Sequence, residues 1–526
     1  MIRMRIKLKK YTSLWPFFLF ASLVQASAVH ADDWSFTPKI ALEEKWTDNA
    51  FSAPRQTKSD FITTATPGLA ISGKGRDLTV GLDYTLSYDR YATYDELSGV
   101  RHRGNGVANA QIVEDLLFLD LRGNISEQQA NPAGPGTAVD RTSASSNTNQ
   151  VTTYSINPQV KHRFGPWAAG VVSYAHNETI TEASSTTSSH NTPSLSNSAL
   201  YGATGNGGMA NSVVDSGKAS LRSGEEFTRM QWGVTSEAMR SEHGSKTFSQ
   251  TTQTLDNEIK ISHEFGFLSQ VGVDSLSGSD LDSDKYSGLF YAGGIHWAPS
   301  AKNDLRLEFG RRYGSLSSKA SVAYAIGPFT QLKLSHTSGV STDALQTAGA
   351  LSNVQRDELG RFVDPFSGLA ANPASSPFAS TNAVYKQRKT EMVLIHRRER
   401  DTLTLLTSLN TRDGITAPST FGAAGTTVLP VANMGQGSTT AMTSTVAWTH
   451  QLTPIVSSTA TLSQSDIISA PVESGKSQRL NASLDLTYQM NPTLASSVGY
   501  HYMDVQPNSS SGVTENVVVI GLRKKF

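Results

Sequence analysis

One stretch of the sequence decides the fold, and it reads Leu78-Thr79-Val80-Gly81-Leu82-Asp83-Tyr84-Thr85-Leu86-Ser87-Tyr88-Asp89. Apolar and polar side chains alternate along it without a fault. Because successive side chains of a β-strand point to opposite faces, one face of this strand is apolar and the other is small, hydroxylic or charged. The pattern recurs along the chain, for example at Leu289–Trp297 and Leu480–Tyr488. Each run covers about 9–13 residues, the length that a tilted strand needs to cross a bilayer.

Strands of this kind must close on themselves in a membrane, because hydrocarbon offers no partner to an open sheet edge. A soluble β-sandwich or β-propeller also alternates, but its strands are typically about five or six residues long. We count 22 runs, and any even number from 18 to 24 is compatible because the pattern is weak near 212–275 and 317–337. No segment of comparable length has a 3.6-residue period. The sequence therefore predicts an all-β protein, a single large antiparallel transmembrane β-barrel over residues 32–526.

The connections between the runs alternate in length. Short ones such as Gly73–Arg76 and Asn491-Pro492 lie at one end of the predicted barrel. The long ones all lie at the other end, at 127–150, 179–211, 338–383 and 412–437. Short periplasmic turns and long extracellular loops are typical of outer-membrane barrels. These loops are rich in Ser, Thr, Asn and Gly, too polar to form a core of their own, and long enough to fold into the lumen.

The composition excludes several other classes of protein. Of the 526 residues 38% are hydrophobic and 17% charged, both below the usual share of a soluble protein, and Cys is absent. Disulfide scaffolds and Cys-zinc sites are therefore excluded. No run after the N-terminal segment reaches the roughly 18 apolar residues of a spanning helix.

The first 31 residues have the features of a signal peptide. Five basic residues up to Lys10 precede an apolar stretch at Ser13–Val24, and Val29-His30-Ala31 offers small residues for cleavage. Removing residues 1–31 leaves 40 basic and 45 acidic residues, so the mature chain is mildly acidic and has no basic patch suited to nucleic acid. We therefore expect export to the outer membrane of a Gram-negative bacterium.

Aromatic residues mark the ends of the runs. Tryptophans near strand ends form interfacial girdles in membrane barrels, and the candidates here are Trp34, Trp46, Trp167, Trp297 and Trp448. The chain ends in an apolar face typical of the signal read by the barrel-assembly machinery, made of Val518, Ile520, Leu522 and Phe526. Lys524 interrupts that face, but a Lys near the interface can extend its ammonium group into water at little cost.

The first strands carry a resemblance to a known family. Trp46-Thr47-Asp48-Asn49-Ala50-Phe51 is followed by Ser59–Leu69, which reads SDFITTATPGL. This order resembles the outer-membrane β-barrel proteins associated with PEP-CTERM and exosortase systems, whose genes lie beside exopolysaccharide loci. The likeness covers roughly the first 60 mature residues. It implies a link to polysaccharide export without a mechanism. From the residues alone, Asp48 and Asn49 suit a turn after the first strand.

A search for catalytic and metal-binding motifs gives little. Val273-Asp274-Ser275-Leu276 lacks the Gly of a Gly-Asp-Ser-Leu esterase motif. Asp280, Asp282 and Asp284 have the first spacings of a calcium loop, but Lys285 stands where that loop needs Gly. We therefore expect no enzyme, no metal and no cofactor.

The polar face of the strands is where function is expected. Its charged residues are Asp83, Asp120, Arg122, Lys161, Arg163, Arg306, Glu308, Arg312, Arg479 and Asp485. About 18 or more strands enclose a water-filled channel unless something plugs it. Mixed signs and hydroxyls suit a neutral or weakly charged hydrophilic solute, plausibly an exopolysaccharide delivered by periplasmic export components. The alternatives are an enzyme with its site among the outer loops and a structural or adhesive barrel with a closed lumen. The other expected partners are outer-membrane lipid and lipopolysaccharide.

Overall fold

The chain forms a closed antiparallel β-barrel of 22 strands. The structure is a computed structural model that describes residues 33–129, 148–183, 211–357, 361–378, 380–416, 437–470, 476–508 and 511–526. Every barrel strand pairs with its neighbours along the chain, and β1 closes the barrel by pairing residues 39–47 with residues 517–525 of β24. The predicted all-β transmembrane barrel is therefore confirmed. The predicted signal peptide, residues 1–31, lies outside the described residues.

The strands alternate in direction around the barrel. Eleven run from the short-turn end to the long-loop end: β1 (Asp33–Thr47), β3 (Leu78–Tyr91), β5 (Leu117–Gln129), β7 (Ala168–Ala183), β9 (Met230–His243), β11 (Phe265–Gly278), β13 (Asn303–Arg312), β15 (Thr330–Ser341), β19 (Asp401–Gly414), β21 (Val456–Ser469) and β23 (Leu494–Pro507). Eleven return: β2 (Asp60–Lys74), β4 (Gly99–Val113), β6 (Thr148–Phe164), β8 (Ser212–Ser223), β10 (Lys246–Lys260), β12 (Gly288–Ser300), β14 (Ser315–Ile326), β18 (Tyr385–Arg397), β20 (Ser438–Thr453), β22 (Ser477–Asn491) and β24 (Val513–Lys525).

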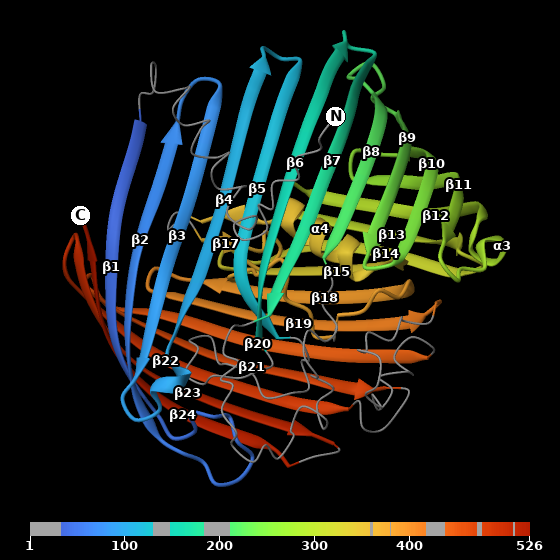
Figure 1. Cartoon of the computed structure of the whole chain (residues 1–526). Coiled ribbons are helices and arrows are strands. Elements are labelled where there is room, and N and C mark those ends of the chain that lie inside the picture. The colour runs from blue at the N-terminus through green and yellow to red at the C-terminus, as the bar shows by residue number, and fades with distance from the viewer. Residues whose placement is uncertain are drawn as a thin grey trace, which may run out of the picture.

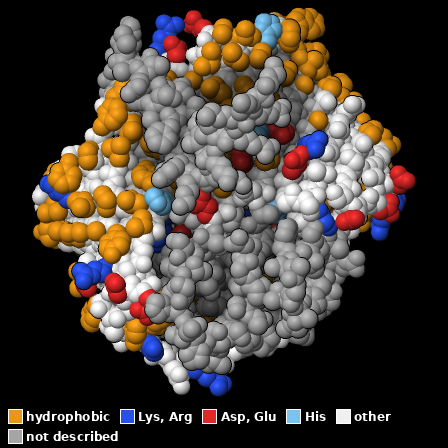
Figure 2. All heavy atoms as spheres, in the orientation of Figure 1, with side chains coloured by type: hydrophobic (Ala, Val, Ile, Leu, Met, Phe, Trp, Pro, Cys, Tyr) orange, Lys and Arg blue, Asp and Glu red, His pale blue; other side chains and the backbone are white. Residues whose placement is uncertain are grey.

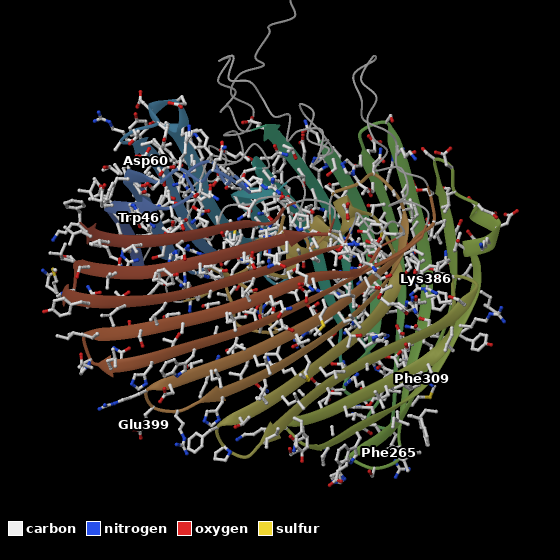
Figure 3. All side chains as sticks on the ribbon, turned by 90° about the horizontal axis from the view of Figure 1, so that it is seen from below. Trp46, Asp60, Phe265, Phe309, Lys386 and Glu399 are labelled. Carbon is white, nitrogen blue, oxygen red and sulfur yellow. The ribbon has the colours of Figure 1, made fainter. Side chains whose placement is uncertain are left out.

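Strand tilt gives the barrel its appearance in projection. In Figure 1, β1–β8 run steeply on one side while β18–β24 run across them on the other, as tilted strands of two opposite barrel walls do. Figure 3 gives the view at right angles, in which Phe265 and Glu399 mark the short-turn end and Trp46 and Asp60 the opposite end. By the loop-length rule the short turns are periplasmic and the long loops extracellular.

The strand register separates an apolar outside from a polar inside. Leu289, Phe309 and Leu316 are among the most exposed large apolar side chains, and all face outward. Figure 2 shows hydrophobic side chains gathered on the flanks of the molecule, including the left-hand flank where β1 and β24 meet. A closed barrel with an apolar exterior satisfies every backbone group within hydrocarbon. This architecture places the protein in the outer membrane of a Gram-negative bacterium.

Two extracellular connections are tighter than the sequence suggested. β9 and β10 continue to a two-residue turn at Gly244-Ser245, and β13 and β14 join at Tyr313-Gly314. Both Tyr313 and Gly314 have positive φ, as a type I′ hairpin requires. The alternation near 212–275 is weak, and the sequence placed these two strands at 226–238 and 250–264, about four residues farther from the turn, with a longer link between them.

The described chain also contains four short elements and one longer helix. The short ones are η2 (Asp95–Leu97), α3 (Ser283–Tyr286), β16 (Gln355–Arg356) and β17 (Phe362–Val363). The helix α4 (Asp343–Asn353) belongs to the connection between β15 and β18 and lies between the barrel walls, shown in yellow in Figure 1. Among the described residues, no helix is long and apolar enough to span a membrane.

Candidate functional site

The connection between β15 and β18, residues 342–384, folds into the lumen, and we call it the inner segment. Its helix α4 starts at Thr342, whose hydroxyl accepts a hydrogen bond from the Leu345 backbone N–H at 3.3 Å. A Thr at this position satisfies one of the donors that a helix start leaves unpaired. Ala344, Ala348 and Leu351 are buried, at the i, i+4, i+7 spacing of one helix face. That face is directed at the lumenal wall formed by β5–β9.

Arg122 of β5 holds the other end of α4. Its guanidinium donates to the backbone carbonyls of Leu351 at 3.3 Å and Val354 at 2.8 Å. A cation at the C-terminus of a helix meets both its unpaired carbonyls and the negative end of its dipole. Asp120 accepts from Arg122 at 2.8 Å and keeps the guanidinium oriented. The predicted lumenal pair Asp120 and Arg122 therefore anchors the inner segment.

A second arginine joins the two ends of the inner segment. Arg412 of β19 donates to Asp343 at 2.7 Å, and its guanidinium lies 4.2 Å from the ring centres of both Phe378 and Tyr385. The Asp343 carboxylate also accepts from the Thr381 backbone N–H at 2.6 Å and from the Tyr385 hydroxyl at 2.7 Å. We call these residues the Arg412 cluster. Through it, one guanidinium holds the start of α4 and the returning chain against the same wall.

Beyond α4 the inner segment reaches β3 and β4. Leu351, Val354 and Phe362 form a buried apolar cluster against Val107 of β4. A Cβ at Gly81 of β3 would overlap the Arg356 guanidinium, so glycine leaves the space that this side chain occupies.

Arg356 is itself partly desolvated by this packing. Burial lowers the pKa of Arg356, while the nearby carboxylates of Asp83 and Asp357 oppose that shift. On its way back, the segment is held to β5 by a hydrogen bond of 2.9 Å between Ser126 and Asn372.

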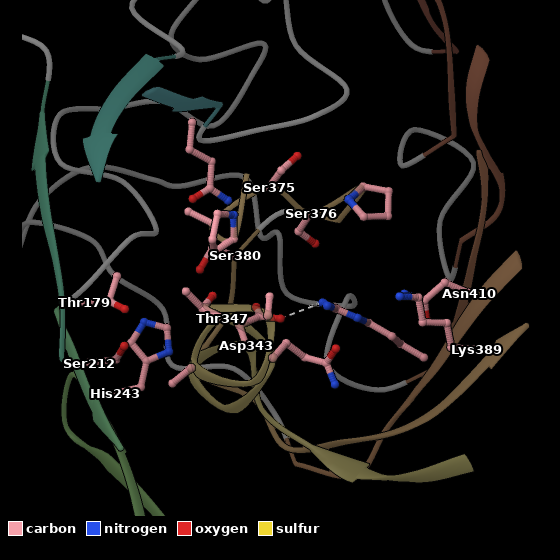
Figure 4. A pocket seen from close by; sticks show the side chains of 18 of the residues that line it. Thr179, Ser212, His243, Asp343, Thr347, Ser375, Ser376, Ser380, Lys389 and Asn410 are labelled. Atoms are coloured by element: carbon pink, nitrogen blue, oxygen red, sulfur yellow. Dashed lines mark hydrogen bonds and ion pairs between the residues drawn. The ribbon is translucent and has the colours of Figure 1, made fainter. Parts of the chain in front are cut away.

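A cavity of about 290 Å³ lies between the inner segment and the barrel wall. Figure 4 shows Thr179, Ser212 and His243 from β7–β9 on one side and Lys389 and Asn410 from β18 and β19 on the other. The inner segment supplies the side chains between them, namely Asp343, Gln346, Thr347, Ser375, Ser376 and Ser380. Hydroxyls and amides dominate this lining. The charged pairs Lys389–Glu391, at 2.8 Å, and Arg412–Asp343 neutralise themselves.

The register places all the charged residues proposed from the sequence on the lumenal face. They fall into three groups. Glu308 pairs with Lys319 on the neighbouring strand, whereas Asp83 with Lys39 and Arg312 with Asp274 each reach across one intervening strand. Arg306 lies near Glu258 and Asp304, and Asp485 binds His501. The residues closest to the strand ends are Lys161, Arg163 and Arg479.

The proposed girdle residues lie at both barrel ends, unevenly. Trp34, Trp167, Trp297 and Trp448 belong to the periplasmic half and Trp46 to the extracellular end. Phe227 in the β8–β9 turn contacts both Trp167 and Trp232 in edge-to-face geometry, at 6.1 and 5.8 Å. The sequence placed a strand at 226–238, with Trp232 near its middle, so Trp232 was not proposed for the girdle; β9 starts at Met230, which puts Trp232 near the strand end. At the C-terminus, Val518, Ile520, Leu522 and Phe526 all face outward, and Phe526 is 72% exposed.

The two weak motifs have structural roles. Asp274 is a buried ion-pair partner of Arg312, at 2.6 Å, and the neighbouring Ser275 points to the opposite face of the strand. Asp280 pairs with Lys246 at 3.2 Å, and Asp282 precedes the short helix α3. Within the described residues, no group of three His, Asp or Glu side chains is placed to hold a metal ion.

Comparison with known proteins finds no matching family model and no matching curated protein. Solved barrels are similar in fold. The FrpB iron transporter from Neisseria meningitidis is 10% identical, with 94% of this chain and 83% of that chain covered and a TM-score of 0.47. The siderophore receptor PirA from Acinetobacter baumannii is also 10% identical, covering 93% and 80%, with a TM-score of 0.47. OpdK from Pseudomonas aeruginosa is 9% identical, covering 94% and 100%, with a TM-score of 0.34.

Proposed function

We propose that this barrel is a pore that passes hydrophilic solute across the outer membrane and that it serves exopolysaccharide export. The observation that carries the pore is the lumen itself. A barrel of 22 strands encloses far more space than its own wall side chains fill. The inner segment occupies part of this space, and a cavity of about 290 Å³ between it and the wall is lined by polar groups. A polar lining of this kind suits a hydrated solute.

The chemistry of the wall supports a saccharide as that solute. Opposite the inner segment, β20 and β21 present hydroxyls to the lumen in bonded pairs, Thr443 with Ser465 at 3.2 Å and Thr445 with Ser463 at 3.0 Å. Hydroxyls both donate and accept, so they can exchange hydrogen bonds with a sliding polyol without a fixed register. The likeness of Trp46–Phe51 and Ser59–Leu69 to exosortase-associated barrels supports the link to an exopolysaccharide locus.

Planar-bilayer recording of the purified full chain tests the pore. We expect steady openings whose current falls when a polysaccharide is added, because the polymer occupies the passage. The matched control is the double variant S126C/N372C. In the unaltered protein the Ser126 Oγ and the Asn372 Oδ1 are 2.9 Å apart. The chain has no other cysteine, so oxidation joins the inner segment to β5 at a known place.

Three outcomes would contradict all or part of the proposal. Silence in the bilayer from correctly folded protein, together with hydrolysis of lipid or peptide, would assign an enzyme instead. Silence with no activity would assign a structural barrel with a closed lumen. Openings that no polysaccharide alters would keep the pore but remove the link to polysaccharide export.

A further inference from the structure

Basic side chains collect on the lumenal face at the periplasmic end of the barrel. The register directs each of them inward, close to the end of its strand, and we call the set the basic collar: Lys74, Lys161, Arg163, Arg222, Lys260, Lys333, Arg397, Arg523 and Lys525.

Contacts with the inner segment and between strands support the inward direction of these side chains. Lys333 donates to the Phe366 backbone carbonyl at 3.0 Å. The ammonium of Lys161 lies 4.5 Å from the ring centre of Phe118, whose neighbours on the lumenal face of β5 are Asp120 and Arg122. Arg163 pairs in register with residue 169 of β7, which in turn pairs with Arg222 of β8. Arg163 and Arg222 therefore lie on the same lumenal face, two strands apart.

The collar differs from the rest of the lumen because its charges are uncompensated. Toward the extracellular end of the lumen, arginines are matched, Arg101 with Asp89 at 2.5 Å and Arg312 with Asp274 at 2.6 Å. Within the described ranges, Lys161, Arg163 and Arg222 form no ion pair, and all three are exposed to the lumen.

The acidic groups at the same level already have partners. His296 contacts Glu258 at 2.7 Å and Asp304 at 2.9 Å. Gln270 donates to Asp256 at 2.6 Å, and Arg122 to Asp120. A hydrogen bond from Gln270 leaves Asp256 charged, but the four acidic residues named here are fewer than the nine basic residues of the collar, so a surplus of positive charge faces the periplasmic mouth.

We propose that the basic collar captures an anionic polysaccharide, one carrying carboxylate groups, as it enters the pore from the periplasm. This rests on the pore function proposed above and names its substrate class. A passage lined by one sign of charge between walls of low dielectric concentrates counter-ions and raises association rates by about 10- to 1000-fold. Arginine binds carboxylates through a planar pair of donors, which suits Arg163 and Arg222. The paired charges farther inside then let the chain slide on without a second strong site.

The periplasmic turns carry charges of both signs. Glu114 and Glu226 are exposed, as are Arg229 and Lys302, and Arg76 pairs with Glu114 at 3.1 Å. The turns therefore favour neither sign of charge. The basic surplus lies inside the lumen, which a flexible anionic chain can enter.

The test compares polymers and charge variants in single-channel recordings at 0.1 M salt. Oligogalacturonate is added to one side of the membrane and then to the other, with a neutral maltooligosaccharide of equal length as reference. In the variant K161Q/R163Q/R222Q three collar charges are removed. The matched control R229Q/K302Q/R400Q removes three exposed charges from the turns at the same end.

We expect oligogalacturonate to block from one side about 10-fold more often than from the other, and maltooligosaccharide to show no preference. The blocking rate of the collar variant should be at least about threefold lower than that of the unaltered protein. The control variant should block at the unaltered rate. The preference should collapse at 1 M salt, where the Debye length falls to about 3 Å. Equal blocking from both sides, or an unchanged rate in the collar variant, overturns the proposal.

Equilibrium binding of labelled oligogalacturonate to the detergent-solubilised barrel separates this proposal from the pore itself. Binding that the collar variant loses, in a protein that shows no conductance, would support the collar and refute the pore. Conductance without such binding would support the pore and refute the collar. If inorganic phosphate competes as well as the polymer at equal charge concentration, the collar is a site for small anions, and the proposal of an anionic polysaccharide is overturned.

Discussion

Replacing Arg412 by alanine should release the inner segment from the barrel wall. The guanidinium is the shared partner of Asp343, Phe378 and Tyr385, and the Arg412 and Asp343 side chains are only 10% and 12% exposed. The substitution leaves the Asp343 carboxylate without its counter-charge and separates the returning chain from β19. Arg412→Lys would keep the charge but lose the planar group that lies between the two rings.

The expected size of the effect follows from the burial of the pair. Removing one partner of a buried ion pair costs about 3–5 kcal/mol. We take about 3 kcal/mol, because the pair borders a cavity that opens to the lumen. Since about 1.4 kcal/mol corresponds to a factor of ten, the ratio of released to docked molecules should rise by about 100-fold. A segment that is released about once in a thousand molecules would then be released in about a tenth of them.

Single-channel recording and limited proteolysis together measure this shift. R412A should show frequent transitions to a larger conductance, and cleavage within the inner segment should become about 100-fold faster when opening precedes cleavage. Oxidation of the cysteine pair at Ser126 and Asn372 should suppress both effects in the same variant.

The matched control is Arg388→Ala on the adjacent strand. Arg388 pairs with Asp413 at 3.0 Å, but these side chains are 52% and 37% exposed, and such surface pairs contribute only about 0–1 kcal/mol. R388A should therefore behave like the unaltered protein. The reasoning would be refuted if R412A and R388A gave the same conductance and the same cleavage rate.

Four further changes have expected outcomes. Arg122→Met removes the cation from the end of α4 and should lower the stability of the docked segment by about 1–2 kcal/mol, seen as faster proteolysis of residues 343–353 with the barrel intact in urea titration. Gly310→Ala should impair barrel folding by at least about 1–3 kcal/mol because its Cβ would lie 1.9 Å from the Tyr291 carbonyl, whereas Gly293→Ala, with open space at its Cβ, should refold normally when followed by gel mobility. Deleting Phe526 should reduce delivery to the outer membrane in cells but not refolding in detergent, because the side chain is exposed and we expect the assembly machinery to recognise it. Burial raises the pKa of Tyr313 to about 12, so its contribution to stability is complete below about pH 10 and is lost as the pH rises toward 12; Tyr313→Phe should flatten stability over that interval.

The strands could be predicted from sequence because the information for them is local. Leu78–Asp89 alternates strictly, and a one-residue slip would turn its apolar face toward water inside the barrel. The same period assigns the lumenal direction of Arg163 and Arg222 without any knowledge of the neighbouring strands. Where alternation is weak, as around β9 and β10, the sequence predicted the strands but placed the turn wrongly.

The inner segment could not be predicted because its position depends on distant partners. Asp343 and Arg412 are 69 residues apart, and Arg122 and Val354 are 232 apart. No local pattern records such pairings. One signal was present and missed: Thr342 followed by Ala344, Ala348 and Leu351 is a capped helix start with one apolar face. It indicates a helix but not the wall that the helix covers.

The inner segment leaves β15 and returns to β18 at nearly one point, since the Thr381 backbone N–H bonds to Asp343 at 2.6 Å and the two strands are direct neighbours in the sheet. An insertion whose two ends meet does not disturb the strand pairing of the barrel that carries it, although its anchors Arg122 and Arg412 belong to the wall. Evolution could lengthen, shorten or exchange this one module and so change what the passage admits, while the cylinder that spans the membrane kept every one of its pairings. By the same logic a graft between related barrels, cut at residues 342 and 384, would carry solute preference with it.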